Sequence, residues 1–231
     1  MTKIDLPQVP RSVPRTYTPH PFTHDELKRF FDACDNIKPR RGRLAAIQRM
    51  TLPVFFRLLY SSGIRTTEAV LLERDDVNLE NGVVSIKRGK GYDQHYVVLH
   101  DTMLPLMRTY DGKIDGLIPN RRVFFPTPDD KPHPPAWVTY HFRVLWQSCN
   151  SSHAIPYELR HHYAIENINS WTHQGFAVHD KLLALSKSMG HRQIESTLAY
   201  YSLTPAISDI MACADNEISQ QLTQDDYEKE D

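Results

Sequence analysis

The stretch DVNLENGVVSIKRGKGYDQHYVVLH, residues 76–100, is where the spacing of apolar side chains changes from a helical to a strand-like period. Val83, Val84 and Ile86 predict one strand, and residues 96–99 predict its partner. The glycine-rich segment RGKGYD between them is typical of a hairpin turn. These residues therefore predict a small antiparallel sheet within the 231-residue chain.

Helical patterns surround this hairpin on both sides. In THDELKRFFDACDNI, Thr23 and Glu26 have the spacing of a capping box, and apolar residues recur on one helical face. A second helical region reaches Gly63, a residue suited to ending a helix, and Pro53 within that region predicts the start of a new helix. The chain shows no internal repeat, so we predict one mainly helical α+β domain. Further helical segments are expected at 64–76, 101–110, 136–149, 157–171 and 179–189.

The two ends of the chain differ from its middle in composition and charge. Residues 1–21 hold five prolines without a period, which is typical of an extended arm. Residues 1–65 carry 12 Lys and Arg against 5 Asp and Glu, whereas residues 207–231 carry one Lys against 8 acids. The net charge of −1 is therefore a sum in which an acidic C-terminal end offsets a basic N-terminal part, and that basic part is suited to binding phosphate groups. We expect a proline-rich arm at 1–21, a single domain at 22–205 and an acidic tail at 206–231.

The bulk composition excludes several classes of protein. Hydrophobic residues make up 40% of the chain and charged residues 24%, which is ordinary for a globular protein. No apolar run approaches the roughly 20 residues needed to span a bilayer, and no signal peptide pattern opens the chain. The three cysteines are far apart and lack C-x-x-C spacing, so we expect reduced thiols and a cytoplasmic protein. The 12 histidines form no H-E-x-x-H motif, so no metal site is expected.

Four motifs in a fixed order carry a resemblance to a known family. YSSGIRTTEAVLLERDDV, IKRGKGYDQHYVVLH, YELRHHYA and MGHRQIESTLAYYS are together similar to the signature boxes of the tyrosine recombinases, the phage integrase family. The resemblance covers about residues 20–204 and implies that family's catalytic-domain fold, with helices around a small antiparallel sheet. It also implies that the catalytic residues are Arg65, Lys90, Arg160, His191 and Tyr200.

The resemblance implies a site-specific recombinase or integrase that cuts and rejoins DNA through a 3′-phosphotyrosine intermediate. Such an enzyme needs no metal, ATP or other cofactor, because the phosphotyrosine conserves the energy of the phosphodiester. The implied partner is double-stranded DNA, bound by a homo-oligomer, a tetramer on paired sites, with other recombinases of the same mobile element as further partners. The implied place of action is the bacterial nucleoid.

The chemistry of these residue types agrees with those roles. Two arginines can each grip nonbridging phosphate oxygens with a planar fork that stays charged. The phenol of Tyr200 has an ordinary pKa of roughly 10, so it needs help to lose its proton before it attacks phosphorus. Lys90, in a glycine-rich turn, can donate a proton to the departing 5′-oxygen as a general acid.

The chain departs from the family pattern in two places, and an alternative function follows. Tyr157 stands where most members have histidine; it can hydrogen-bond a phosphate but cannot act as a base near neutral pH. His161 lies about 100° around the helix from Arg160, so we do not expect it to substitute directly.

The second departure is at the N-terminus. Only some 20 proline-rich residues precede the domain, whereas typical integrases carry a separate core-binding domain there. The chain is expected to be either a short form, as in the small fimbrial invertases, or one whose first domain has been lost. The alternative functions are a DNA-binding regulator that kept the fold and lost the chemistry, and a type IB topoisomerase.

Overall fold

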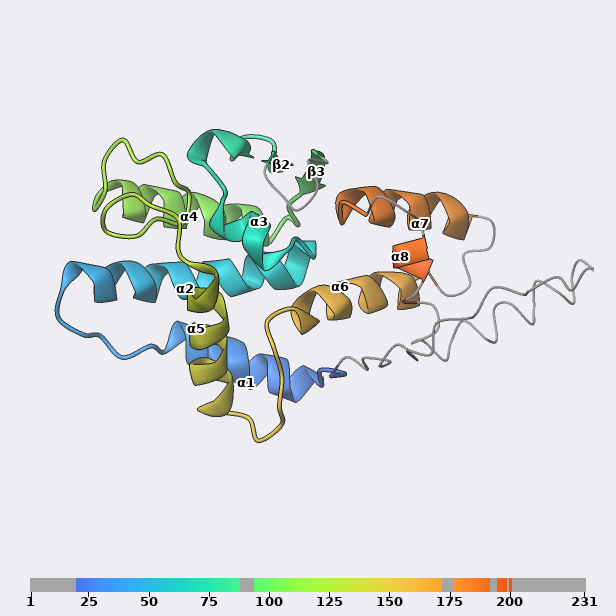
Figure 1. Ribbon diagram of the computed structural model, residues 1–231, viewed down its shortest axis with the longest axis horizontal. Coiled ribbons are helices and arrows are strands. Elements are labelled where there is room, and N and C mark those ends of the chain that lie inside the picture. The colour runs from blue at the N-terminus through green and yellow to red at the C-terminus, as the bar shows by residue number, and fades with distance from the viewer. Residues whose placement is uncertain (1–19, 88–93, 172–176, 192–194, 199, 201–231) are drawn as a thin grey trace, which may run out of the picture.

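The computed structural model describes residues 20–87, 94–171, 177–191, 195–198 and 200 (Figure 1). Helices predominate and surround a small antiparallel sheet, which confirms the predicted fold class. The elements in chain order are α1 (His24–Asp35), α2 (Arg43–Ser62), α3 (Thr66–Val70), the 3-10 helix η1 (Arg74–Asp76), β1 (Val77–Asn78), β2 (Val83–Ile86), β3 (His95–Val98), α4 (Met103–Asp115), α5 (Pro135–Gln147), α6 (Glu158–Asn169), α7 (Ala177–Ser188) and α8 (Glu195–Leu198). The expected arm, up to residue 19, and the expected acidic tail lie outside the described residues.

The sheet contains the predicted hairpin and one strand that the sequence pattern did not reveal. Strands β2 and β3 pair antiparallel, with Val83 opposite Val98 and Ile86 opposite His95. The two-residue strand β1 adds to the outer edge of β2 and gives the order β1-β2-β3. A strand of two residues is too short for a period-2 pattern to be visible in the sequence.

Helix α2 is one continuous helix, so the prediction that Pro53 begins a new helix is wrong. A proline inside a helix removes a backbone hydrogen bond and costs about 3 kcal/mol. Buried side chains on both sides of Pro53, including Leu52 and Phe55, offset this cost by packing against the rest of the domain. The other local signals hold: Thr23 and Glu26 form the predicted capping box, and Gly63 ends α2 with a left-handed φ of 64°.

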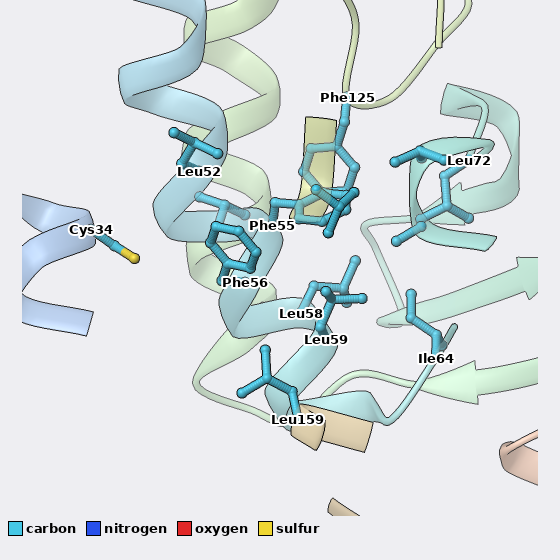
Figure 2. Packing of buried hydrophobic residues seen from close by; sticks show 14 of the residues in the cluster. Cys34, Leu52, Phe55, Phe56, Leu58, Leu59, Ile64, Leu72, Phe125 and Leu159 are labelled. Atoms are coloured by element: carbon cyan, nitrogen blue, oxygen red, sulfur yellow. The ribbon is translucent and has the colours of Figure 1, made fainter. Parts of the chain in front are cut away.

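The main hydrophobic core is built around α2. Figure 2 shows side chains of this helix, among them Phe55, Phe56 and Leu59, packed between residues from several other elements. A second, smaller cluster lies where α6, α7 and the segment after α8 meet; it holds Ala164, Ile168, Trp171, Leu182, Leu185, Met189 and Tyr200. The candidate nucleophile is thus held by packing against α6 and α7. Across the described ranges, no helix has both the length and the apolar character that crossing a bilayer requires.

Gly63 occupies a position that no other residue fits. Its φ is 64°, and a Cβ built there would lie 2.3 Å from Cδ1 of Tyr163. We expect Gly63→Ala to lower the free energy of unfolding by about 2–4 kcal/mol, from backbone strain and overpacking. Gly112→Ala is the matched control, because Gly112 lies within α4 with nothing within 4 Å of an added Cβ. That variant should gain up to about 1 kcal/mol in urea unfolding; equal stabilities of the two variants would contradict the prediction.

Candidate active site

Four of the five predicted catalytic residues converge on one region of the described structure. Arg65 precedes α3, Arg160 lies in the first turn of α6, His191 follows α7 and Tyr200 follows α8. Contacts among their side chains and the backbone near residue 190 join them. The fifth, Lys90, lies outside the described residues.

The guanidinium of Arg65 is oriented by a buried carboxylate and a backbone carbonyl. Its Nη1 donates to Glu68 Oε1 at 2.6 Å, and the Arg65 backbone N–H donates to the other oxygen of Glu68 at 2.8 Å. Its Nη2 donates to the carbonyl of Gly190 at 2.9 Å. The Glu68 side chain is only 1% exposed, against 24% for that of Arg65. The buried carboxylate thus fixes the orientation of the guanidinium, while part of the Arg65 side chain stays accessible.

Arg160 is buried and ties three segments together. Its Nη1 donates to the carbonyl of Gly63 at 2.5 Å, and its Nη2 donates to the carbonyl of Met189 at 2.7 Å. The same Nη2 lies 2.9 Å from Nε2 of His191. Burial lowers the pKa of Arg160, and the charge of Arg65 adds to this effect, although an arginine remains charged at neutral pH. Within the described residues, Nε of Arg160 has no hydrogen-bond partner, so one buried donor is left over.

Two glycines place the carbonyls that the arginines bind. Gly63 accepts from Arg160 and Gly190 accepts from Arg65, and both glycines have φ near +63°. A Cβ on Gly190 would lie 2.6 Å from Cε1 of His95 on β3, so the chain turns there with no room for a side chain. The glycines that end α2 and α7 therefore serve the two arginines as well as the helix ends.

His191 is neutral, and the tautomer follows from its neighbours. Arginine has no acceptor, so the 2.9 Å contact requires His191 Nε2 to accept from Arg160. The proton then resides on Nδ1, which lies 2.6 Å from Oγ1 of Thr197. Burial, followed by the charges of Arg160 and Arg65, lowers the pKa of His191 to about 4.

This depressed pKa predicts a pH dependence of stability. The pKa of His191 is about 4 in the folded protein, whereas an unfolded histidine titrates near 6.5. The unfolded state therefore binds more protons between these values, and stability is lost as the pH falls from about 6.5 to about 4. After allowance for solvent screening, this contributes about 1–2 kcal/mol, and urea unfolding of His191→Gln should show a shallower slope in that window. A ring NMR signal of His191 that titrates near pH 6.5 would contradict the assignment.

The phenol of Tyr200 is buried in the middle of this group. The residue is 5% exposed, and its ring stacks on that of His191 at a centroid distance of 6.3 Å. Burial raises the pKa of Tyr200 to about 12, while the charge of Arg160 and its hydrogen bond to the phenol act in the opposite direction. The phenol thus holds its proton strongly in the resting structure, and deprotonation needs a partner.

His161 contacts the candidate nucleophile. Nδ1 of His161 lies 3.1 Å from Oη of Tyr200. Tyr157 is 41% exposed at the start of α6, and its ring meets that of His161 edge to face at 4.8 Å. This contact was not predicted from the sequence, and the expectation that His161 does not substitute directly for the missing histidine stays a prediction. The usable signal was its spacing of four residues from Tyr157, which puts both rings on one face of the helix.

Comparison with known proteins gives a family match over most of the chain. Residues 21–206 match the model of the phage integrase family. The putative integrase/recombinase y4rE of Sinorhizobium fredii is 28% identical over 212 residues, which cover 88% of this chain and 66% of that protein. Tyrosine recombinase XerC of Chlorobaculum tepidum is 26% identical over 198 residues, covering 79% of this chain and 56% of that protein. This chain thus spans about two thirds or less of these relatives' own length.

A solved structure resembles the fold. The crystal structure of XerH site-specific recombinase bound to palindromic difH substrate, a post-cleavage complex, superposes with a TM-score of 0.62 at 20% identity. The match covers 87% of this chain and 55% of that chain. At this level of identity, the likeness concerns the fold.

Proposed function

The chain belongs to the phage integrase family, and from this premise we propose that it is a site-specific tyrosine recombinase. It cuts and rejoins double-stranded DNA through a 3′-phosphotyrosine formed by Tyr200. The observation that carries the proposal is the convergence of Arg65, Arg160 and His191 around one buried phenol. Residues 22–205 are the catalytic domain in this proposal, supported by the family match over residues 21–206.

The proposed binding of phosphate relies on the two arginines. A phosphodiester that is attacked without a metal gathers negative charge on its nonbridging oxygens, and fixed guanidinium groups stabilise that charge. Arg65 is held by Glu68, and its side chain is 24% exposed. Arg160 has one N–H without an acceptor in the described part of the chain, which a phosphate oxygen satisfies. Because both guanidinium groups are already oriented, little reorganisation is needed when DNA binds.

The proposed cleavage step is a single displacement at phosphorus. Oη of Tyr200 forms a bond to phosphorus as the bond to the 5′-oxygen breaks, and the phenol loses its proton. Lys90 donates a proton to the departing 5′-oxygen. Rejoining is the reverse: a 5′-hydroxyl attacks the phosphotyrosine and releases Tyr200. The bond count is conserved in each direction, so the cycle needs no cofactor.

The proposal also covers the oligomeric state, the partners and the cellular location of the protein. The protein acts on DNA as a homo-oligomer, with a tetramer on two paired sites, and other recombinases of a mobile element serve as further partners. This rests on the premise of family membership and on the resemblance to a recombinase solved with a bound DNA substrate. The bacterial nucleoid, in the cytoplasm, is the proposed place of action.

A nicked duplex tests the function directly. DNA from the genomic flank of the gene is nicked just 3′ of each candidate cleavage position, so that the released short 5′-hydroxyl strand diffuses away and traps the adduct. We expect a covalent protein–DNA band in denaturing gels that forms equally well with EDTA and without nucleotides. Binding without any adduct on these substrates would favour the regulator, and relaxation of a plasmid that lacks a recombination site would favour a topoisomerase.

A further inference from the structure

The nucleophile has a histidine at hydrogen-bond distance that the family motifs do not assign. Nδ1 of His161 lies 3.1 Å from Oη of Tyr200. We propose that His161 is the general base that takes the proton of Tyr200 as the phenol attacks the phosphodiester. This inference rests on the proposed function, because it assigns a proton acceptor to the same reaction.

The surroundings of His161 suit this role. The Tyr157 ring packs edge to face against the imidazole at a centroid distance of 4.8 Å, and the centroid of the Tyr200 ring lies 5.3 Å from it. Tyr200 is only 5% exposed, so bulk water has little access to its hydroxyl. A side-chain base already in contact therefore replaces the solvent as proton acceptor.

The other groups near the phenol are less suited to accept its proton. His191 receives a hydrogen bond from Arg160 on Nε2 and faces Thr197 with Nδ1, so its lone pair is in use. A tyrosine side chain such as Tyr157 can donate or accept a hydrogen bond but is not a typical general base. Arg160 is a donor, and its hydrogen bond to the Tyr200 phenol stabilises the phenolate as it forms.

The protonation state of His161 fits a base at neutral pH. Burial lowers the pKa of His161 below its usual 6.5, with the carboxylate of Glu158 opposing this shift and the charge of Arg160 adding to it. Among the described residues, the rings that face His161 from outside α6 include Tyr200 and, across that ring, His191, and both are uncharged at pH 7. The imidazole is therefore neutral, and the role requires the tautomer with its proton on Nε2 and the lone pair of Nδ1 directed at Oη.

The proton balance closes in both directions. During cleavage, the proton on Oη moves to Nδ1 of His161, the bond from Oη to phosphorus forms, and the bond to the 5′-oxygen breaks. The departing oxygen receives its proton from a separate acid, which we assign to Lys90. During rejoining, the protonated His161 returns its proton to Oη as the phosphotyrosine bond breaks.

A pH profile of single-turnover cleavage separates this role from a structural one. On the nicked duplex, the wild type should reach a plateau from about pH 7 upward, because His161 is deprotonated there. His161→Gln should be slower by about 10²–10⁴-fold at pH 7, with a rate that keeps rising toward alkaline pH as Tyr200 itself ionises. His162→Gln is the matched control: the next residue on α6, whose ring stacks on Tyr60 at 5.4 Å, should retain the wild-type profile.

Two further measurements guard against a misfolded variant and against confusion with the general acid. His161→Ala should regain rate with added imidazole, which a purely structural loss would not allow. A substrate with a 5′-bridging sulfur needs no proton on its leaving group, so it should restore Lys90→Ala but leave His161→Gln slow.

Each outcome decides the matter. A wild-type profile in His161→Gln, no imidazole rescue, or recovery of His161→Gln on the sulfur substrate overturns the general-base role while the recombinase function stands. A wild type that forms no adduct on any flank overturns the proposed function and this role with it.

Discussion

Tyr200→Phe is expected to abolish the covalent protein–DNA adduct while DNA binding stays nearly intact. Removing the nucleophile eliminates the bond-forming atom, so cleavage should fall by about 10⁴-fold or more, below detection in a gel. Binding should weaken only by about one hydrogen bond, roughly 0.5–1.5 kcal/mol. The phenyl ring keeps the packing of the Tyr200 side chain in the small cluster with Leu185 and Met189, so the variant should fold. Denaturing gels and mobility shifts of the same samples give the two readouts.

Tyr201→Phe is the matched control for this prediction. Tyr201 is adjacent in the chain but lies ten residues after His191, whereas Tyr200 lies nine residues after it. We expect Tyr201→Phe to form the adduct at a rate within a few fold of the wild type. Adduct formation that survives in Tyr200→Phe and disappears in Tyr201→Phe would reverse the assignment.

Local signals in the sequence were enough for most of the fold. The hairpin of β2 and β3, the capping box at Thr23 and the helix end at Gly63 each depend on residues close in the chain. Pro53 led to a wrong prediction because apolar contacts with other helices outweigh the preference of proline for the start of a helix. The short strand β1 was not predicted from the sequence, because the two residues that pair with β2 show little periodic pattern of their own.

The candidate site likewise contains residues that the sequence motifs predict and contacts that they do not. The motifs led to Arg65, Arg160, His191 and Tyr200 because each box names its residue at a fixed place. The contact of His161 with Tyr200 spans 39 positions and depends on how Tyr200, after α8, packs against α6 and α7. The carbonyl of Gly190 likewise reaches an arginine 125 positions away. Such long-range contacts leave no periodic trace, so the base and the orienting groups became visible only in three dimensions.

Arg160→Lys is expected to lose both catalysis and stability. The guanidinium of Arg160 serves the carbonyls of Gly63 and Met189 at the same time, and a lysine ammonium is a single point that cannot span both. One buried carbonyl left without a donor costs about 1–3 kcal/mol, and lost packing adds to this cost. The free energy of unfolding measured in urea should therefore be about 2–4 kcal/mol lower than that of the wild type. Single-turnover cleavage should fall by about 10²–10³-fold, because one oriented phosphate donor is lost.

Arg65→Lys separates the two effects. The Arg65 side chain is 24% exposed, whereas Arg160 as a residue is 2% exposed, so a lysine at position 65 can direct its ammonium to Glu68 or to solvent without leaving two buried carbonyls unsatisfied. We expect Arg65→Lys to lose cleavage to a similar degree but to unfold within about 1 kcal/mol of the wild type. Cleavage of both variants is measured at a temperature where circular dichroism shows each to be folded. If Arg160→Lys cleaves within threefold of the wild type, the buried guanidinium is a packing element and the phosphate is held by Arg65 with other donors.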